Sequence, residues 1–218
     1  SSVALARAAE LRMAEGDLAG ARRAAGSALE RTPDDGRALA VLGFVDLAQL
    51  RTAEATAAFE KAVSADSGLS LAHLGLGIAR IRSGDVDKGR EELQIAAGLD
   101  PDDSLLRSYL AKAYYEERRT DEAGKELEVA KELDPRDPTP YLYDAIRKQN
   151  ENRPVEALED LRASIARNDN RAVYRSRLLL DQDRAVRGSD LARIYNDLGF
   201  EQLGLVTARR SADQDQAN

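Results

Sequence analysis

Few residues of this chain have the types and spacing that catalysis requires. The chain has no cysteine and a single histidine, which excludes thiolate zinc sites, imidazole pairs, iron–sulfur clusters and cysteine nucleophiles. His73 occupies a helical packing position, and no Gly-x-Ser-x-Gly turn exists to present a serine beside it. Adjacent carboxylates such as Glu116 and Glu117 lie near an expected turn, where they favour solubility over acid–base chemistry. We therefore expect a protein that is not an enzyme and that needs no cofactor or metal.

Composition and charge exclude further classes of function. The 218 residues are 43% hydrophobic, which is enough to build a core and argues against global disorder. The net charge of −7 argues against a nucleic-acid partner, because phosphate backbones attract a basic excess. No apolar run approaches the roughly 18 residues that a membrane span requires. We expect a partner that is another protein or peptide, without nucleic-acid binding or membrane insertion.

The chain repeats a pattern of 34 residues. Matched phrases surround Pro33, Pro101 and Pro135, which are separated by 68 and 34 residues. This frame predicts one domain with repeats at 2–35, 36–69, 70–103, 104–137 and 138–171, an insertion at 172–184 and a repeat at 185–218. We also expect the native protein to continue beyond Asn218, because stacked repeats need a polar cap.

Each unit has the pattern of two short helices joined by a turn. Apolar residues recur at helical spacing before the turn, as in Leu39, Leu42 and Val45. The turn carries residues such as Gly84, which can end a helix in the left-handed conformation. Small residues occupy the eighth, twentieth and twenty-seventh positions of every unit, where they allow two antiparallel helices to approach closely. The sequence thus predicts an all-α array of antiparallel helix pairs.

These residues resemble a known family. A 34-residue helix–turn–helix with Leu-Gly or Leu-Ala at positions seven and eight, alanine at twenty and twenty-seven and proline at thirty-two is similar to the tetratricopeptide repeat. The resemblance covers nearly the whole chain and implies a right-handed superhelical solenoid. The chain departs from the pattern at Ser67, where proline is usual, and at Asp144, where leucine is usual. The stretch 168–205 also resembles large bacterial proteins that combine such repeats with a predicted outer-membrane portion, which favours a periplasmic over a cytoplasmic location.

The resemblance implies a groove for a partner. In this family the first helix of each repeat lines a concave face, through positions 2, 5, 9, 12 and 13. Carried to this sequence, these positions predict a groove for an apolar peptide or an amphipathic helix. The predicted groove residues are Phe44, Leu47, Leu74, Ile78, Ile81, Lys112, Tyr115, Leu142 and Ile146. The alternative is that several of these side chains pack between adjacent repeats and never reach solvent.

Arginines gather around the predicted insertion. They are Arg162, Arg167, Arg171, Arg175, Arg177, Arg184 and Arg187. This basic rim would suit an acidic partner or a membrane surface, and the alternative is a solvated face with local ion pairs.

A second function remains open at this point, which is a structural or self-associating segment of a larger bacterial envelope protein. The same apolar stripe would then join copies of the chain, so a homo-oligomer in solution would distinguish the two functions.

Overall fold

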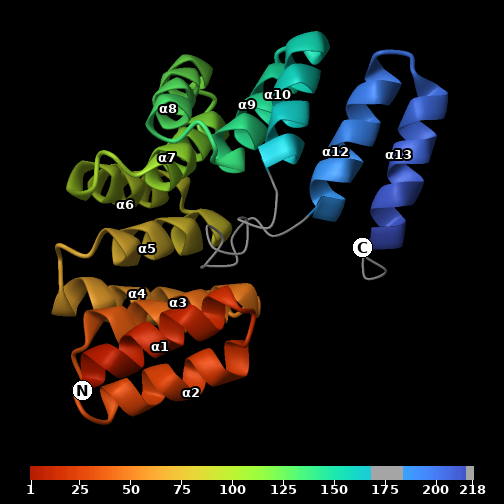
Figure 1. Ribbon diagram of the computed structural model, residues 1–218. Helices are drawn as coiled ribbons and strands as arrows, with labels where there is room; N and C mark the ends of the chain where they lie inside the picture. The colour runs from red at the N-terminus through yellow and green to blue at the C-terminus, as the bar shows by residue number, and fades with distance from the viewer. Residues whose placement is uncertain (168–183, 215–218) are drawn as a thin grey trace.

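The computed structural model describes residues 1–167 and 184–214, and these residues form a succession of helices without a strand among them (Figure 1). The helices are α1 (Ser2–Ala14), α2 (Leu18–Leu29), α3 (Gly36–Ala48), α4 (Thr52–Ala65), α5 (Ser70–Arg82), α6 (Val86–Leu99), α7 (Ser104–Glu116), α8 (Thr120–Leu133), α9 (Pro138–Asn150), α10 (Pro154–Arg167), α12 (Arg184–Asp197) and α13 (Glu201–Gln214). They form six antiparallel pairs, which we number as repeats 1 to 6.

Aspartates begin many of these helices. Asp17 accepts a hydrogen bond from the backbone N–H of Gly20 at 2.7 Å, and Asp35 accepts one from Ala38 at 3.1 Å. Each bond satisfies an amide that has no partner within the first helical turn. The Gly20 amide also lowers the pKa of Asp17, because its hydrogen bond favours the ionised carboxylate.

The turn inside each repeat requires a left-handed residue. Gly16 and Gly84 supply it in repeats 1 and 3, with φ of 81° and 91°. Repeats 2 and 4 use Leu50 and Arg118 instead, with φ of 60° and 61°. A side chain with a Cβ is disfavoured in this conformation, so the packing of the flanking helices imposes the turn there.

Small residues bring the two helices of a repeat together. In repeat 3 both contact positions are glycine, and a Cβ added at Gly77 would lie 2.8 Å from the backbone oxygen of Gly89. In repeat 2 a Cβ at Gly43 would lie 2.7 Å from the ring of Phe59. The absence of these side chains therefore sets the close helix spacing.

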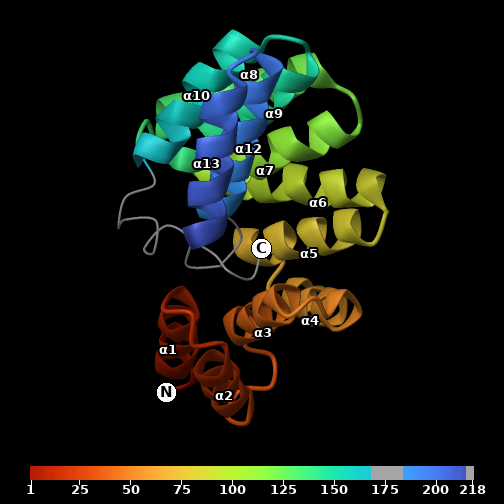
Figure 2. The same cartoon turned by 90° about the vertical axis from the view of Figure 1, so that its right-hand side faces the viewer.

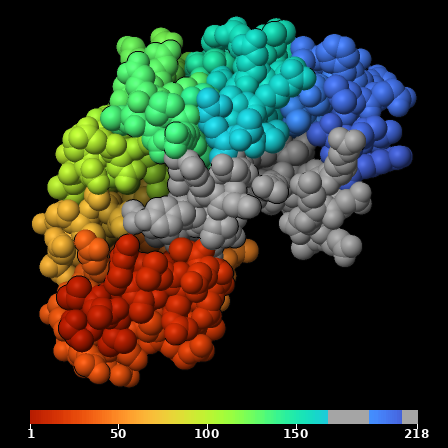
Figure 3. Space-filling model, viewed as in Figure 1, coloured from red at the N-terminus to blue at the C-terminus, as the bar shows by residue number. Residues whose placement is uncertain are grey.

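The pairs stack into a curved array. Each second helix packs on the first helix of the next repeat, and α1, α3, α5, α7 and α9 also pack on one another in succession. Because the first helices contact one another, they lie on the inner side of an arc. Repeat 1 lies at one end of this arc and repeat 6 at the other (Figures 1 and 3). The buried core runs along the arc from α1 to α8, with a second cluster formed by α9, α10 and α12.

Candidate functional site

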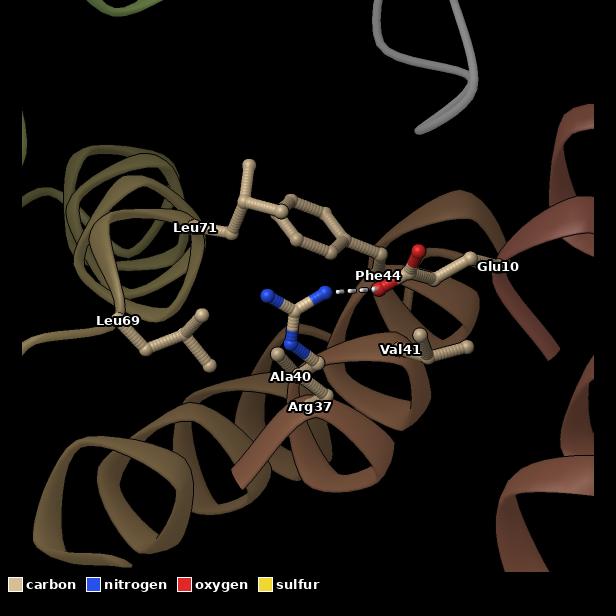
Figure 4. Close-up of a pocket in the computed structure, with 7 residues that line it drawn as sticks. All are labelled: Glu10, Arg37, Ala40, Val41, Phe44, Leu69 and Leu71. Atoms are coloured by element: carbon tan, nitrogen blue, oxygen red, sulfur yellow. Dashed lines mark ion pairs between the residues drawn. The ribbon is translucent and has the colours of Figure 1, made fainter. Parts of the chain in front are cut away.

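A hollow opens on the inner face of the arc, between α1, α3 and α5 (Figure 4). It is shallow, with only about 10 Å³ of enclosed space, and its lining is mostly apolar. The lining residues are Glu10, Arg37, Ala40, Val41, Phe44, Leu69 and Leu71. A shallow apolar surface of this kind can be contacted by an apolar side chain but does not enclose one.

An ion pair forms one edge of the hollow. Arg37 Nη1 lies 3.7 Å from Glu10 Oε1, and Arg7 pairs with the same carboxylate. Glu10 is only 8% exposed, so these two guanidinium groups compensate a charge that would otherwise be costly to bury. Since the carboxylate is already paired, the surface that the hollow leaves open is mainly apolar.

The Phe44 ring at the base of the hollow packs against Phe59 in the core. The rings of Phe44 and Phe59 meet edge to face, with centroids 4.8 Å apart and planes at 73°. Phe59 fits because the neighbouring first helices carry glycine: a Cβ at Gly75 would lie 2.0 Å from its ring. Phe44 therefore has one face in the core and belongs to the hollow only at its surface.

The structure divides the predicted groove residues into two groups. Phe44, Leu47, Leu74 and Leu142 are buried, at 7% exposure or less. These four side chains pack inside the array of helices and offer almost no surface to a partner. Ile78, Ile81, Lys112, Tyr115 and Ile146 are half-buried on first helices, so that part of each side chain remains exposed.

The polar members of the predicted groove make contacts within the array. Lys112 Nζ lies 5.5 Å from the centre of the Tyr143 ring, on the next first helix. Tyr115 receives a hydrogen bond from the side-chain amide of Asn150. These contacts link α7 to α9 and hold both side chains in place along the inner face.

Two arginines of the predicted basic rim have structural partners. Arg162 donates to the hydroxyl of Tyr195 at 3.0 Å, and Arg167 donates to the backbone oxygen of Pro135 at 2.7 Å. Arg167 also stacks on the ring of Tyr141, 4.1 Å from its centre. The other rim positions, Arg171, Arg175 and Arg177, lie outside the described residues, as do the side chains of Arg184 and Arg187.

Sequence reasoning missed three lining residues of the hollow, Glu10, Val41 and Leu69. Glu10 occupies position 9 of repeat 1, which has the same place in its repeat as Phe44 in repeat 2. The signal that points to Glu10 is therefore its position in the repeat, the same that predicts Phe44. Leu69 lies just before α5, outside the lining positions, so only the stacking of repeats reveals it.

His73 is a structural residue. Its Nδ1 lies 2.6 Å from Glu92 Oε2, and its Nε2 lies 3.1 Å from the backbone oxygen of Ser67. Arg107, at the same position of the next repeat, donates to the equivalent pair of acceptors, the oxygen of Pro101 and the carboxylate of Glu126. The histidine therefore ties α5 to α6 and to the preceding loop, as the arginine ties α7 to α8.

A buried charge network joins α8, α9 and α10. Asp144 accepts hydrogen bonds or ion pairs from Lys131 Nζ at 2.6 Å, Arg147 Nη2 at 2.7 Å and Lys148 Nζ at 3.0 Å. Asp160 pairs with the same two lysines. Burial alone would raise the pKa of Asp144, but Lys131 together with Lys148 and Arg147 lowers it to about 2. The network is satisfied internally, which favours a role in holding these helices in register.

The described part of the chain lacks two further kinds of feature. Residues 1–167 and 184–214 contain no group of three or more side chains placed to hold a metal ion. None of the helices in these ranges has the length and apolar character that spanning a bilayer requires.

Comparison with known proteins identifies the fold. Residues 74–138 match the family model of the tetratricopeptide repeat, and the helix pairs on either side continue the same stack. The fold is a solenoid of the tetratricopeptide-repeat type. Comparison with curated protein sequences gives no match.

Solved structures with a similar fold have low sequence identity to this chain. A chain of the APC/C hetero-tetramer Cut9–Hcn1 gives a TM-score of 0.76 at 15% identity, covering 93% of this chain, which spans only 39% of that chain. TTC0263, a thermophilic TPR protein in Thermus thermophilus, gives 0.68 at 21% identity, covering 83% of this chain and 100% of its own. YrrB, described as a TPR protein with an unusual peptide-binding site, gives 0.53 at 16% identity, covering 89% and 93%. These likenesses show the fold alone.

Proposed function

We propose that this chain is a scaffold that binds an apolar or amphipathic peptide segment of another protein along its inner face. The tetratricopeptide fold supports a protein-interaction scaffold, and YrrB, which is similar in fold, is described with a peptide-binding site. The observation that carries the proposal is the apolar hollow between α1, α3 and α5. It offers an apolar contact for a side chain of that segment, beside further half-buried apolar residues.

The proposed contact surface extends from the hollow along α5, α7 and α9. Leu71 lines the hollow, and Ile78, Ile81, Tyr115 and Ile146 continue the inner face toward the middle of the array. Removing apolar surface from water contributes about 25 cal/mol for each Å², from which the entropic cost of association is subtracted. A segment with apolar residues at helical or extended spacing would gain most from this surface. No catalytic step is proposed.

A pair of double variants tests this proposal. Leu71→Glu/Ile78→Glu places two charges on the inner face, whereas Ile95→Glu/Val129→Glu places them on exposed sites of the second helices α6 and α8. A displayed library of random 12-residue peptides is selected against the parent chain. We expect enrichment of peptides rich in leucine, isoleucine or phenylalanine, with binding weakened about tenfold or more by the inner-face variant and retained by the control.

Two outcomes would count against the proposal. One is a selection that enriches no peptide. The other is a set of peptides that bind the inner-face variant as tightly as the parent, after circular dichroism has shown both to be folded.

A second candidate function is a structural or self-associating segment of a larger bacterial envelope protein. Exposed apolar side chains on the last helix favour it, since Phe200, Leu203, Leu205 and Val206 are each more than 40% exposed on or beside α13.

A further inference from the structure

The two helices of each repeat differ in charge. The first helices of repeats 1 to 5 contain nine lysines or arginines and four acidic residues, whereas the second helices of the same repeats contain nine and thirteen. The first helices follow one another along the stack, from α3 through α5 and α7 to α9, and lie on the inner side of the arc (Figure 2). This side therefore has an excess of positive charge, although the chain as a whole has a net charge of −7.

Carboxylates of the second helices neutralise some cations of the first helices. Arg80 of α5 lies 2.7 Å from Glu92 of α6 and 3.8 Å from Glu60 of α4. Arg107 of α7 pairs with Glu126 of α8 at 3.0 Å. The charges of these two guanidinium groups are therefore compensated within the chain.

Other cations join consecutive first helices and have no carboxylate of their own. Arg82 of α5 is exposed and donates to the backbone oxygen of Leu47 in α3, at 2.9 Å. Lys112 of α7 lies over the ring of Tyr143 in α9, 5.5 Å from its centre. In the part of the chain that the structure describes, both contacts are with uncharged groups. Because each contact reaches the neighbouring first helix, both cations lie where first helices meet.

The hollow between α1, α3 and α5 adds a third cation. Arg37 lines it and reaches across to Glu10 of α1, which also pairs with Arg7. Two guanidinium groups thus share one carboxylate, which leaves an excess positive charge beside the apolar lining. The side chain of Arg37 is 59% exposed, so a partner can reach it.

The acids of the first helices offset little of this charge. Glu10, Asp46 and Asp144 are buried and ion-paired. The fourth acid of these five helices is Glu116, which is exposed at the C-terminal end of α7. We call three residues the inner cations: Arg37, Arg82 and Lys112.

We propose that the partner segment is acidic as well as apolar, so that its carboxylates meet the inner cations while its apolar side chains contact the first helices. This inference rests on the proposed function, because it names the chemistry of the same partner. Exposed ion pairs add little affinity one by one, but a matching charge speeds encounter and rejects basic segments. A nucleic acid is disfavoured, because its phosphates gain nothing from the apolar surface and are repelled by the net charge of −7.

Three matched peptide libraries test the charge of the partner. Each peptide of about 12 residues has leucine, isoleucine or phenylalanine at the same helical positions, and the other positions are all Glu, all Gln or all Lys. The libraries are selected against the 218-residue chain at about 50 mM salt. We expect the best Glu peptide to bind about fivefold or more tightly than its Gln counterpart, and the Lys peptide to bind most weakly. At about 0.5 M salt the Glu and Gln peptides should differ by less than about twofold, because salt screens exposed charges.

Two double variants of equal net charge test which cations are responsible. Arg37→Gln/Arg82→Gln removes two inner cations, whereas Lys61→Gln/Lys125→Gln removes two exposed cations from the second helices α4 and α8. The first variant should weaken binding of the Glu peptide about fivefold or more and leave binding of the Gln peptide within about twofold of the parent. The control should leave both affinities unchanged. The Gln peptide also reports on folding, because a misfolded variant would lose both peptides.

Several results would overturn this inference and leave the proposed function intact. One is a Gln or Lys peptide that binds as tightly as the Glu peptide at low salt. Another is the control variant losing as much affinity for the Glu peptide as the inner-cation variant. A third is a Glu peptide that binds equally well when serine replaces its apolar residues, or that an oligonucleotide of equal charge displaces, since the surface would then select charge alone.

Failure of the proposed function gives a different result. The Gln peptides carry no charge, so their binding depends on apolar contact alone. If Leu71→Glu/Ile78→Glu binds every selected Gln peptide as tightly as the parent does, the apolar groove itself is wrong.

Discussion

Replacing Asp144 by asparagine removes one negative charge from the buried network between α8, α9 and α10 while the side-chain shape is kept. Lys131, Arg147 and Lys148 then lose the carboxylate they share, and Asp160 alone faces the two lysines. Breaking a buried pair costs about 3–5 kcal/mol when a charge is left without compensation. The lysine side chains keep 16–18% exposure, so water relieves part of this cost and we expect a loss of about 2–3 kcal/mol.

The same carboxylate predicts how stability depends on pH. Its pKa is lowered from 3.8 to about 2 in the folded chain, and each pKa unit corresponds to about 1.4 kcal/mol. Because the folded value is the lower one, this stabilisation is complete above about pH 4 and is lost as the pH falls toward 2. It amounts to about 2 kcal/mol in total, of which about half is lost by pH 3. Asp144→Asn lacks this contribution, so its deficit relative to the parent should shrink over this interval.

The assay is urea unfolding followed by circular dichroism at pH 7, 4 and 3. Three proteins are compared: the parent, Asp144→Asn and Asp121→Asn, which neutralises an exposed carboxylate on α8. The control should stay within about 0.5 kcal/mol of the parent, as surface substitutions usually do. A deficit for Asp144→Asn below about 0.5 kcal/mol at pH 7 would refute the reasoning. A deficit that stays constant down to pH 3 would refute it equally.

Two local predictions follow from the packing. His73→Ala should lower the free energy of unfolding by about 1–3 kcal/mol in a urea titration, because Glu92 and the backbone oxygen of Ser67 lose a hydrogen-bond partner. His73→Arg should be tolerated better, because Arg107 already occupies the equivalent site in the next repeat. Equal losses for the two variants would contradict this reasoning. Gly75→Ala should lower the thermal midpoint, since its Cβ would lie 2.0 Å from the Phe59 ring and overpacking costs about 1–3 kcal/mol. The control Gly26→Ala has open space around its Cβ and should raise the free energy of unfolding by about 0.5–1 kcal/mol. Stabilisation by Gly75→Ala would show that the ring moves freely.

The succession of helix pairs could be predicted because its causes are local and recur every 34 residues. Aspartate caps, glycine turns and small contact residues each act within one repeat, so a single sequence displays them. The left-handed Leu50 and Arg118 could not be predicted, since neither residue type favours that conformation. They are imposed by helices that the neighbouring repeats already hold in place.

The candidate site was harder to predict, because it depends on contacts between repeats. Position 9 marks Phe44 as a groove residue, yet its burial depends on Phe59, fifteen residues later, and on Gly75 of the next repeat. Asp144 stands out in the sequence as a departure from leucine. Its partner Lys131 belongs to the preceding repeat, so only the stacked structure shows that the charge is satisfied.

The measurement that tests the scaffold function most directly is NMR of isoleucine methyl groups during titration with a selected apolar peptide. The chain has six isoleucines, which report on different surfaces. Ile78, Ile81 and Ile146 are half-buried on the first helices α5 and α9, while Ile95 and Ile165 are exposed on second helices, at 45% and 39%. Binding along the inner face should shift the first three signals and leave the other two unchanged. Shifts confined to Ile95 and Ile165 would contradict the proposed site.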